Sequence, residues 1–357
     1  LSVLIGIHCR QAVLWGGAVL LLGFMIALCF FSPMVQLWPV TATLTSYITG
    51  AFQILGIHLL IGFREGKLIR QYMPRQIHNI LISLEGNQRF HNKRHQVIVL
   101  MTDLAGYTTV TSLLKEPDYV LELMNDYLEE TSLALQEKYE GWLEAYVGDM
   151  VCYYWPFRDE NKQKAYQNAL KAALELTSLQ KRFFSSVNKR YENRFPEETL
   201  NHISSIINAG IGLASGVAVM GDLGPKNGVR KFGLLGDPLN LAARLESLTR
   251  LFNTEIIACD EFATIAKTMN IPFRRLGRFN VKGRIEPSML YALGDCDDER
   301  FFVENIAQWN EWLIELEKGS LPALSCPKIY NKDRQTLTKW MDRNLLKPDG
   351  VWKLDEK

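Results

Sequence analysis

The stretch that decides the fold is QVIVLMTDLAGYTT, residues 96–109. Its first part, Gln96–Thr102, is apolar enough for a strand that is buried on both faces. Asp103 follows that strand directly, and the glycine-containing sequence after it is typical of a turn that opens a helix. The stretch therefore predicts a core strand that ends in a carboxylate.

The segments that follow alternate between helical and extended patterns. Long helices are expected over 118–139 and 162–189. Between them, Trp142–Val147 and Met150–Trp155 are two short strands joined by Gly148-Asp149, which is typical of a tight hairpin. Further strands are expected at 208–216, 229–235, 255–258 and 273–281, with a helix at 237–249. The order strand, helix, hairpin, helix, strand indicates an α+β fold with a ferredoxin-like, split βαβ sheet.

Asp103 and Asp149 are expected to lie side by side, because a split βαβ sheet brings their strand ends to one edge. Two carboxylates beside the exposed N–H groups of a helix start form a site for divalent cations and phosphate. Each aspartate also has an ordinary structural explanation, Asp103 as a helix cap and Asp149 as a turn residue. The residues alone leave both explanations open.

A second polar cluster lies in GDPLNLAARLE, residues 236–246. Asn240 and Arg244 are four residues apart and share one face of the expected helix. A carboxamide and a guanidinium placed together can orient a ribose and stabilise charge on a transferring phosphoryl group. The alternative is a solvated polar face on which Arg244 pairs with Glu140 or Glu246.

Charged residues are distributed unevenly along the chain. The protein has 357 residues with 40 Lys+Arg and 39 Asp+Glu, and only Arg10 of these lies before Arg64. Residues 64–357 therefore carry equal numbers of basic and acidic groups. This balance argues against nucleic acid as a partner, because general nucleic-acid binders need a basic surplus.

The uncharged run from Gln11 to Phe63 is too long for one membrane span and suits two. We expect spans at 14–31 and 40–63, with a buried helical hairpin of a soluble core as the alternative. Basic residues flank both spans on the same side, which predicts a multi-pass protein of the inner (plasma) membrane, in contact with lipid, with residues 64–357 in the cytoplasm. Residues 1–8 are expected to be the tail of an earlier span that follows an extracytoplasmic domain.

Two further segments flank the predicted sheet. Residues 64–95 are expected to be a linker, an amphipathic helix broken near Pro74, whose apolar stripe packs on the following domain or on a second copy of itself. Residues 294–357 form a C-terminal extension, in which helical spacing predicts a helix over 297–317. The six cysteines are scattered and are expected to be free thiols.

Taken in order, these motifs resemble the class III nucleotide cyclases, which share the adenylate and guanylate cyclase homology domain. MTDLAGYTT (101–109) and VGDMVCYYWPF (147–157) resemble the two metal-binding motifs of that family. GIGLASGVAVMGDLG (210–224) is similar to the strand before the dimerisation arm, and GDPLNLAARLE to the transition-state helix. The resemblance covers 96–293, and the flanking parts, including DGVWKLDEK (349–357), resemble the bacterial subgroup with an extracytoplasmic CHASE2 sensor.

The resemblance implies an adenylate cyclase that works as a homodimer with two Mg²⁺ or Mn²⁺ ions and accepts ATP in preference to GTP. The implied metal ligands are Asp103, Asp149 and the backbone of Leu104. The implied phosphate-binding residues are Ala105, Gly106, Tyr107, Thr108 and Lys282. Asn240 would hold the ribose, and Arg244 would stabilise the transition state, both from the other subunit.

The base-selecting positions depart from the family pattern. Adenylate cyclases commonly have Lys, and guanylate cyclases Glu, at the position that is Ala145 in this chain, and the partner position is Gly233. Glu144 is one residue away, so its side chain is expected on the other face of the strand unless a bulge intervenes. The alternative function is therefore a cyclase-like nucleotide-binding receptor domain that is weak or inactive as an enzyme.

Overall fold

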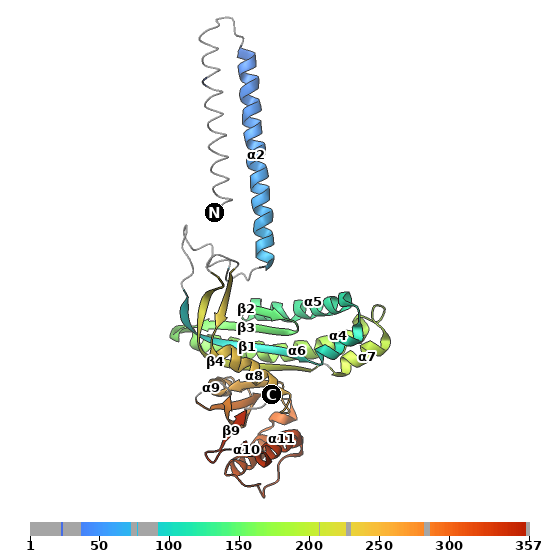
Figure 1. The fold of residues 1–357 in the computed structure, drawn as a ribbon, viewed down its shortest axis with the longest axis vertical. Helices are drawn as coiled ribbons and strands as arrows, with labels where there is room; N and C mark the ends of the chain where they lie inside the picture. Colours follow the sequence, from blue (N-terminus) through green and yellow to red (C-terminus); the bar gives the residue numbers. More distant parts are fainter. Residues whose placement is uncertain are drawn as a thin grey trace. The chain divides into compact units, whose positions relative to one another are not determined.

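The computed structural model describes residues 23, 37–72, 77, 92–206, 208–225, 230–281 and 286–354. The chain divides into two compact units, residues 1–81 and 82–357. The first contains the long helix α2 (Leu37–Tyr72), labelled in Figure 1. Apart from Gly23, the expected span at 14–31 lies outside the described residues, as does Pro74.

Helix α2 contains the whole of the expected span at 40–63 and continues without interruption to Tyr72, into the expected linker. Within it, Ser46–Arg64 is the one stretch of the described residues that is long and apolar enough to cross a membrane. Its mean hydropathy is 1.4 and none of it is buried.

The second unit is built around one sheet, to which the described residues contribute nine strands. Their order is β2-β3-β1-β4-β6-β8-β7-β9, and β5 pairs with β4. The strands are β1 (Lys93–Ala105), β2 (Trp142–Val147), β3 (Met150–Phe157), β4 (Asn208–Leu223), β5 (Lys231–Leu235), β6 (Ile256–Cys259), β7 (Phe273–Val281), β8 (Ser288–Leu293) and β9 (Val351–Leu354). β1 lies between β3 and β4 and is antiparallel to both, which is the predicted split βαβ order.

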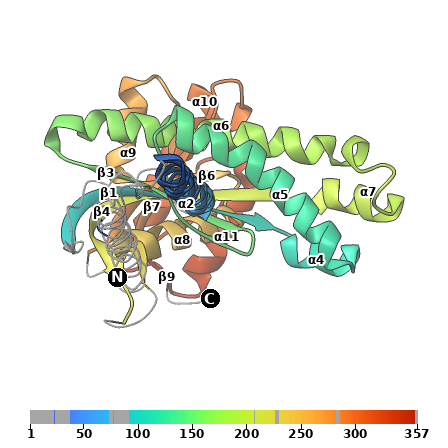
Figure 2. The ribbon, with the colours of Figure 1, turned by 90° about the horizontal axis from the view of Figure 1, so that it is seen from above.

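Helices cover both faces of this sheet. They are α4 (Tyr107–Leu114), α5 (Pro117–Leu133), α6 (Lys162–Arg190), α7 (Glu197–Ile206), α8 (Asp237–Thr249), α9 (Asp260–Thr268), α10 (Val303–Glu317) and α11 (Asn331–Asp342). Figure 2 shows α6 running across the unit, with α7 near its end. Gln180 of α6 bonds to Thr102, whereas Arg250 at the end of α8 bonds to Asp103. Because neighbouring strand residues point to opposite faces, α6 and α8 lie on opposite sides of β1.

Two glycines of β4 allow α8 to lie directly on the sheet. A Cβ at Gly212 would lie 2.0 Å from the carbonyl oxygen of Ala242, and one at Gly210 would lie 2.1 Å from Oγ1 of Thr249. Any side chain at these positions would push the helix away from the strand. The glycines therefore fix the height of α8 above β4 and β1.

Some elements differ from their expected bounds. β1 and β4 are both longer than predicted, and α5 ends at Leu133 and continues as a π-helical turn, Ala134–Lys138. The helix expected from residue 297 begins only at Val303. The side chain of Asp298 accepts from the N–H of Arg300 at 2.9 Å, which stabilises a separate 3₁₀ turn before the helix.

The C-terminal extension forms part of the same core. β9 pairs in parallel with β7, and Trp309 and Trp352 are completely buried. Arg274 of β7 and Asp333 of α11 form an ion pair with 2.6 Å between Nη2 and Oδ2, and both side chains are completely buried. The extension is thus joined to the sheet by a strand, aromatic packing and a buried charge pair.

Candidate active site

Asp103 and Asp149 lie next to each other at one edge of the sheet. The N–H of Leu104 donates to Oδ2 of Asp149 at 3.1 Å. Asp149 is the second residue of the two-residue turn between β2 and β3, and Gly148 before it has a φ of 64°, which glycine adopts readily. A metal contact from the Leu104 backbone would come from its carbonyl oxygen, because hard divalent cations take oxygen ligands.

The two carboxylates interact electrostatically. Burial, together with the hydrogen bond and the negative charge of Asp103, raises the pKa of Asp149 to about 6. A neighbouring cation would relieve this repulsion. Within the described ranges there is no group of three or more His, Cys, Asp or Glu residues at metal spacing. Two carboxylates fit Mg²⁺ or Mn²⁺, which take their remaining ligands from backbone carbonyls, water and phosphate groups.

The start of α4 lies beside these carboxylates. Gly106 has a φ of 90°, in the left-handed region, and its carbonyl oxygen accepts from the N–H groups of Thr109 and Val110, both at 3.0 Å. The N–H groups of Tyr107 and Thr108 are earlier in the same turn, where a helix offers no acceptor. Such a turn can bind phosphate.

The structure does not place the two other implied phosphate-binding residues, Ala105 and Lys282, in this turn. Ala105 is the last residue of β1 and pairs with Asn208 of β4, so it belongs to the sheet. Lys282 lies outside the described residues. Tyr107 is close to the carboxylates, since burial and the charge of Asp149 both raise its pKa.

Arg250 also contacts Asp103, a contact that the sequence does not predict. Its Nη2 lies 2.6 Å from Oδ2 of Asp103 and 3.3 Å from Oε1 of Glu246. Burial raises the pKa of Glu246 to about 7, although Arg250 opposes that shift. The spacing of Glu246 and Arg250 could have predicted their pairing. The contact with Asp103 depends on α8 lying against β1, for which the sequence gives no local signal.

Asn240 and Arg244 share a face of α8 that does not point into the core. Asn240 is exposed and Arg244 is partly exposed, whereas Leu241 and Leu245 are buried. In the part of the chain that the structure describes, Arg244 forms no ion pair. The expected pairing of Arg244 with Glu140 or Glu246 is therefore absent, whereas a solvated polar face stays open as the alternative for this side of α8.

The glutamates considered as partners of Arg244 are bound elsewhere. Glu140 interacts with Lys164 and Asn168, and Glu246 with Arg250. Asn240 is ten residues from Arg250, or about 15 Å along the helix axis. Asn240 therefore lies well away from Asp103 of the same chain.

Glu144, Ala145 and Gly233 meet at a β-bulge. Leu143 pairs with Tyr153 and Ala145 pairs with Cys152, which leaves Glu144 as the extra residue of β2. The bulge interrupts the alternation that would direct Glu144 away from Gly233. A Cβ at Gly233 would lie 2.9 Å from Oε1 of Glu144, so the glutamate occupies the space of the absent side chain.

The carboxylate of Glu144 is held by two donors from β5. Oε1 accepts from Nζ of Lys231 at 2.7 Å, and Oε2 accepts from the N–H of Leu234 at 3.1 Å. The Glu144 side chain is only 8% exposed. Ala145 and Gly233, which have no side chain able to hydrogen-bond to a nucleobase, thus lie beside a carboxylate and an ammonium group. Neighbouring residues, Glu144 and Lys231, supply these two groups.

Comparison with known proteins identifies the family. Residues 90–295 match the sequence model of the adenylate and guanylate cyclase catalytic domain. The chain belongs to this family. Its cyclase domain therefore comprises the described sheet from β1 to β8 and the helices between those strands.

Individual relatives of the cyclase domain agree with this assignment. The chain is 25% identical over 236 residues to an adenylate cyclase of Anabaena cylindrica, an alignment that covers 65% of this chain and 42% of that protein. It is 26% identical over 253 residues to the terminal-differentiation specific adenylate cyclase of Dictyostelium discoideum, covering 68% and 11%. A bacterial light-regulated adenylyl cyclase structure superposes with a TM-score of 0.51 at 20% identity, covering 71% and 68%. The chain thus spans less than half the length of these two sequence relatives.

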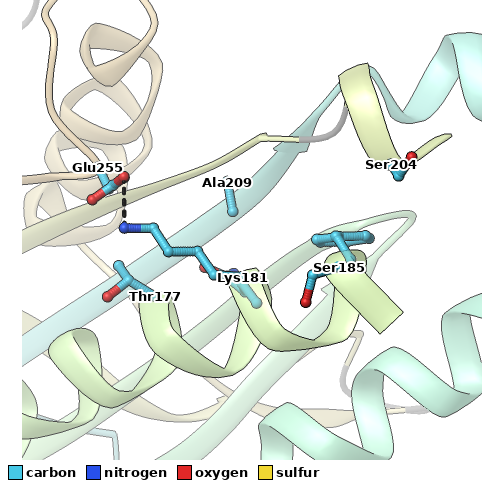
Figure 3. Close-up of a pocket in the computed structure, with 8 residues that line it drawn as sticks. Thr177, Lys181, Ser185, Ser204, Ala209 and Glu255 are labelled. Carbon is cyan, nitrogen blue, oxygen red and sulfur yellow. Dashed lines mark ion pairs between the residues drawn. The ribbon is translucent and has the colours of Figure 1, made fainter. Parts of the chain in front are cut away.

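A cavity of about 230 Å³ lies on the other face of the cyclase sheet, beside α6 (Figure 3). Lys181 and Glu255 meet at its edge, with Nζ 3.0 Å from Oε1. Gln180, which also lines the cavity, donates to Oγ1 of Thr102 at 3.1 Å. Because Thr102 and Asp103 point to opposite faces of β1, this cavity is separate from the two carboxylates.

Proposed function

We propose that the chain is a membrane-anchored nucleotidyl cyclase that converts ATP to the 3′,5′-cyclic nucleotide and diphosphate for signal transduction. The observation that carries this proposal is the pairing of Asp103 with Asp149 beside the start of α4. In the reaction, the ribose 3′-oxygen forms a bond to the α-phosphorus. The bond between the α-phosphorus and the bridging oxygen breaks, diphosphate leaves, and the 3′-hydroxyl proton passes to solvent.

Each part of the site has a role in this reaction. Asp103 and Asp149 would hold the Mg²⁺ or Mn²⁺ ions that cyclases of this family generally use, which would supply charge to polarise the phosphoryl group and to make the 3′-hydroxyl more acidic. The N–H groups of Tyr107 and Thr108, together with Lys282, bind the phosphates. Asn240 orients the ribose, and Arg244 stabilises negative charge on the α-phosphoryl group in the transition state.

A homodimer completes the site. Asn240 lies well away from Asp103 of its own chain, so in this proposal it serves the carboxylates of a second copy. Exposed apolar side chains support an interface between copies, since Val217, Leu235 and Val147 are 51%, 63% and 59% exposed. Each dimer then contains two sites, and every site combines residues of both chains.

Hydropathy and charge support the membrane anchor in this proposal. The apolar stretch Ser46–Arg64 and the uncharged run before it favour insertion in the inner membrane, in contact with lipid. The cluster of basic residues from Arg64 onward favours a cytoplasmic catalytic unit. The motif resemblance supports a CHASE2-type sensor as the source of the signal.

One observation favours GTP as a second candidate substrate. Guanine presents two neighbouring donors, N1–H and the 2-amino group, which match a carboxylate, and an acceptor at O6, which matches an ammonium group. Glu144 and Lys231 are such a pair beside Gly233. Adenine presents one donor and one acceptor on the same edge, so it uses the pair less fully.

The test is a cyclase assay on the full chain in detergent, with ATP or GTP and Mn²⁺, in which the cyclic product is measured by mass spectrometry. We expect product that is lost in Asp103→Ala and retained in the matched control Asp159→Asn, which alters an exposed aspartate outside the site. No product with either nucleotide from a verified dimer would favour the inactive receptor. Product that survives Asp103→Ala would exclude the assigned site.

A further inference from the structure

Arg250 and Glu246 are charged side chains beside the proposed metal site to which the proposed reaction gives no role. One nitrogen of Arg250, Nη2, lies between two carboxylates, 2.6 Å from Oδ2 of Asp103 and 3.3 Å from Oε1 of Glu246. Two cations repel each other strongly at such distances. A metal ion on this oxygen of Asp103 and the guanidinium of Arg250 therefore compete with each other.

Glu246 gives Arg250 a second place to bind. The two residues are four apart on α8, so they remain neighbours whatever happens at Asp103. The Glu246 side chain is only 6% exposed, and Arg250 is the one cation that the described structure places within ion-pair distance of it. A buried carboxylate without a partner is unfavourable, so Glu246 attracts the guanidinium when Asp103 releases it.

The backbone that carries Arg250 is fixed by the C-terminal extension. The hydroxyl of Thr336 donates to the carbonyl oxygen of Leu251 at 3.1 Å, and the N–H of Asn253 donates to Asp333. The C-terminal extension therefore holds the turn after α8 in place through the residues that directly follow Arg250. The Arg250 side chain itself is 47% exposed and has room to change its position without moving the turn.

We propose that Arg250 is an internal counter-cation of the metal site, which neutralises Asp103 in the metal-free enzyme and moves onto Glu246 when a divalent cation binds. The proposal rests on the proposed role of Asp103 as a metal ligand. Its consequence is that the contact between Arg250 and Asp103 sets the metal concentration at which the site fills. Arg250 would thus regulate the enzyme without contacting the nucleotide.

The test is Mn²⁺ binding to the full chain in detergent, followed by the electron paramagnetic resonance signal of free Mn²⁺. The variant Asp103→Asn measures the background Mn²⁺ binding that does not involve the proposed site. We expect Arg250→Gln to bind Mn²⁺ about three- to tenfold more tightly than wild type, the range expected when one partly exposed ion pair no longer competes. Arg278→Gln is the matched control, because it removes the same charge from an exposed position on β7.

Glu246→Gln should change the Mn²⁺ affinity in the opposite direction from Arg250→Gln. Without its second partner, Arg250 stays on Asp103, so Mn²⁺ binding becomes weaker. In the double variant with Arg250→Gln this weakening disappears, whereas it would persist if Glu246 acted on the metal only through its own charge.

The possible results distinguish the role of Arg250 from the existence of the metal site. Tighter binding in Arg250→Gln, with no change in Arg278→Gln, supports the proposal. Binding that depends on Asp103 and is equal or weaker in Arg250→Gln would overturn the role of Arg250 and leave the metal site intact. If wild type binds no more Mn²⁺ than Asp103→Asn, the proposed metal site is wrong and so is this inference.

Discussion

Leu104 and Asp149 are 45 positions apart in the sequence, yet the N–H of Leu104 donates to Oδ2 of Asp149 at 3.1 Å. This bond joins the end of β1 to the tip of the β2–β3 hairpin. It leaves Asp149 facing Asp103, whose negative charge helps to raise the Asp149 pKa. The same carboxylate therefore has a structural role and a proposed chemical one, and substitutions can separate the two.

Asp149→Asn keeps an acceptor for the Leu104 N–H and removes the charge. We expect it to fold normally and to lose cyclase activity by at least about 100-fold, because the metal ions supply most of the charge stabilisation in such reactions. Asp149→Ala removes both features and should also lower the melting temperature relative to Asp149→Asn. Activity and thermal unfolding of the full chain measure these effects. An Asp149→Asn variant within tenfold of wild-type activity would contradict the assignment.

The raised pKa of Asp149 predicts how metal binding depends on pH. With a pKa of about 6, this carboxyl group is mostly protonated at pH 5 and ionised at pH 7. Since a metal ion requires the ionised form, Mn²⁺ affinity should rise as the pH increases through about 6 and level off above about 7. Calorimetric titrations across this range would measure the change. A constant affinity between pH 5 and 7 would be inconsistent with Asp149 as a ligand.

The same shift predicts the stability of the metal-free protein. The pKa of the folded state lies above the ordinary value of 3.8, so the folded state binds the proton more tightly than the unfolded state. This contribution to stability is present at low pH and is lost as the pH rises through about 6. Asp149→Asn should therefore raise the melting temperature by about 2–4 °C at pH 7, and by less at pH 5. Metal-free wild type and variant, compared by calorimetry at both pH values, provide the test.

The sequence predicted what local patterns encode. The apolar run before Asp103 and the Gly148-Asp149 turn identified β1 and the hairpin, and their order implied the edge at which the two aspartates meet. The C-terminal strand β9 was not predicted, because Val351–Leu354 is too short to identify alone and is defined by its pairing with β7.

Two features of the site depend on tertiary packing and were beyond prediction from local patterns. The bulge at Glu144 is defined by the register between β2 and β3, which strand alternation cannot reveal. Arg250 meets Asp103 only because Gly210 and Gly212 allow α8 to lie directly on the sheet. In both cases a neighbour in space, rather than a neighbour in sequence, determines where the charge is placed.

Gly233→Ala tests the role of the bulge. Its methyl group would lie 2.9 Å from Oε1 of Glu144, too close for the present position of the carboxylate. We expect the ratio of kcat/KM for ATP and GTP to change by about three- to tenfold, since one displaced base contact is worth about 1 kcal/mol. Ala307→Ser is the control, because it adds an atom at an exposed position of α10 outside the site. An unchanged ratio in Gly233→Ala would exclude Glu144 from base recognition.

The buried pair Arg274 and Asp333 predicts a stability effect in the C-terminal extension. The guanidinium packs against the rings of Trp309 and Tyr330, at 4.7 and 4.2 Å from their centroids. Asp333→Ala would leave this cation buried without a counter-ion, which typically costs about 3–5 kcal/mol of unfolding free energy. Lys164→Ala breaks the exposed pair with Glu140 and should cost less than about 1 kcal/mol. Equal losses in denaturant titrations of the two variants would contradict the extension being part of the core.

Complementation between inactive variants tests whether each active site uses two chains. Asp103→Asn and Arg244→Ala should each be inactive as homodimers, since every site then lacks one component. A mixed dimer of the two variants contains one site with both intact residues and one site that lacks both. Because the two sites of a symmetric dimer are equivalent, a purified mixed dimer should recover about half of wild-type activity.

Separate affinity tags on the two co-expressed chains would isolate this mixed dimer for the assay. If Asp103 and Arg244 acted within one chain, both chains of the mixed dimer would remain inactive. The mixture of Asp103→Asn with Asp149→Asn is the matched control, because both substitutions then damage the same half of each site and no intact site can form.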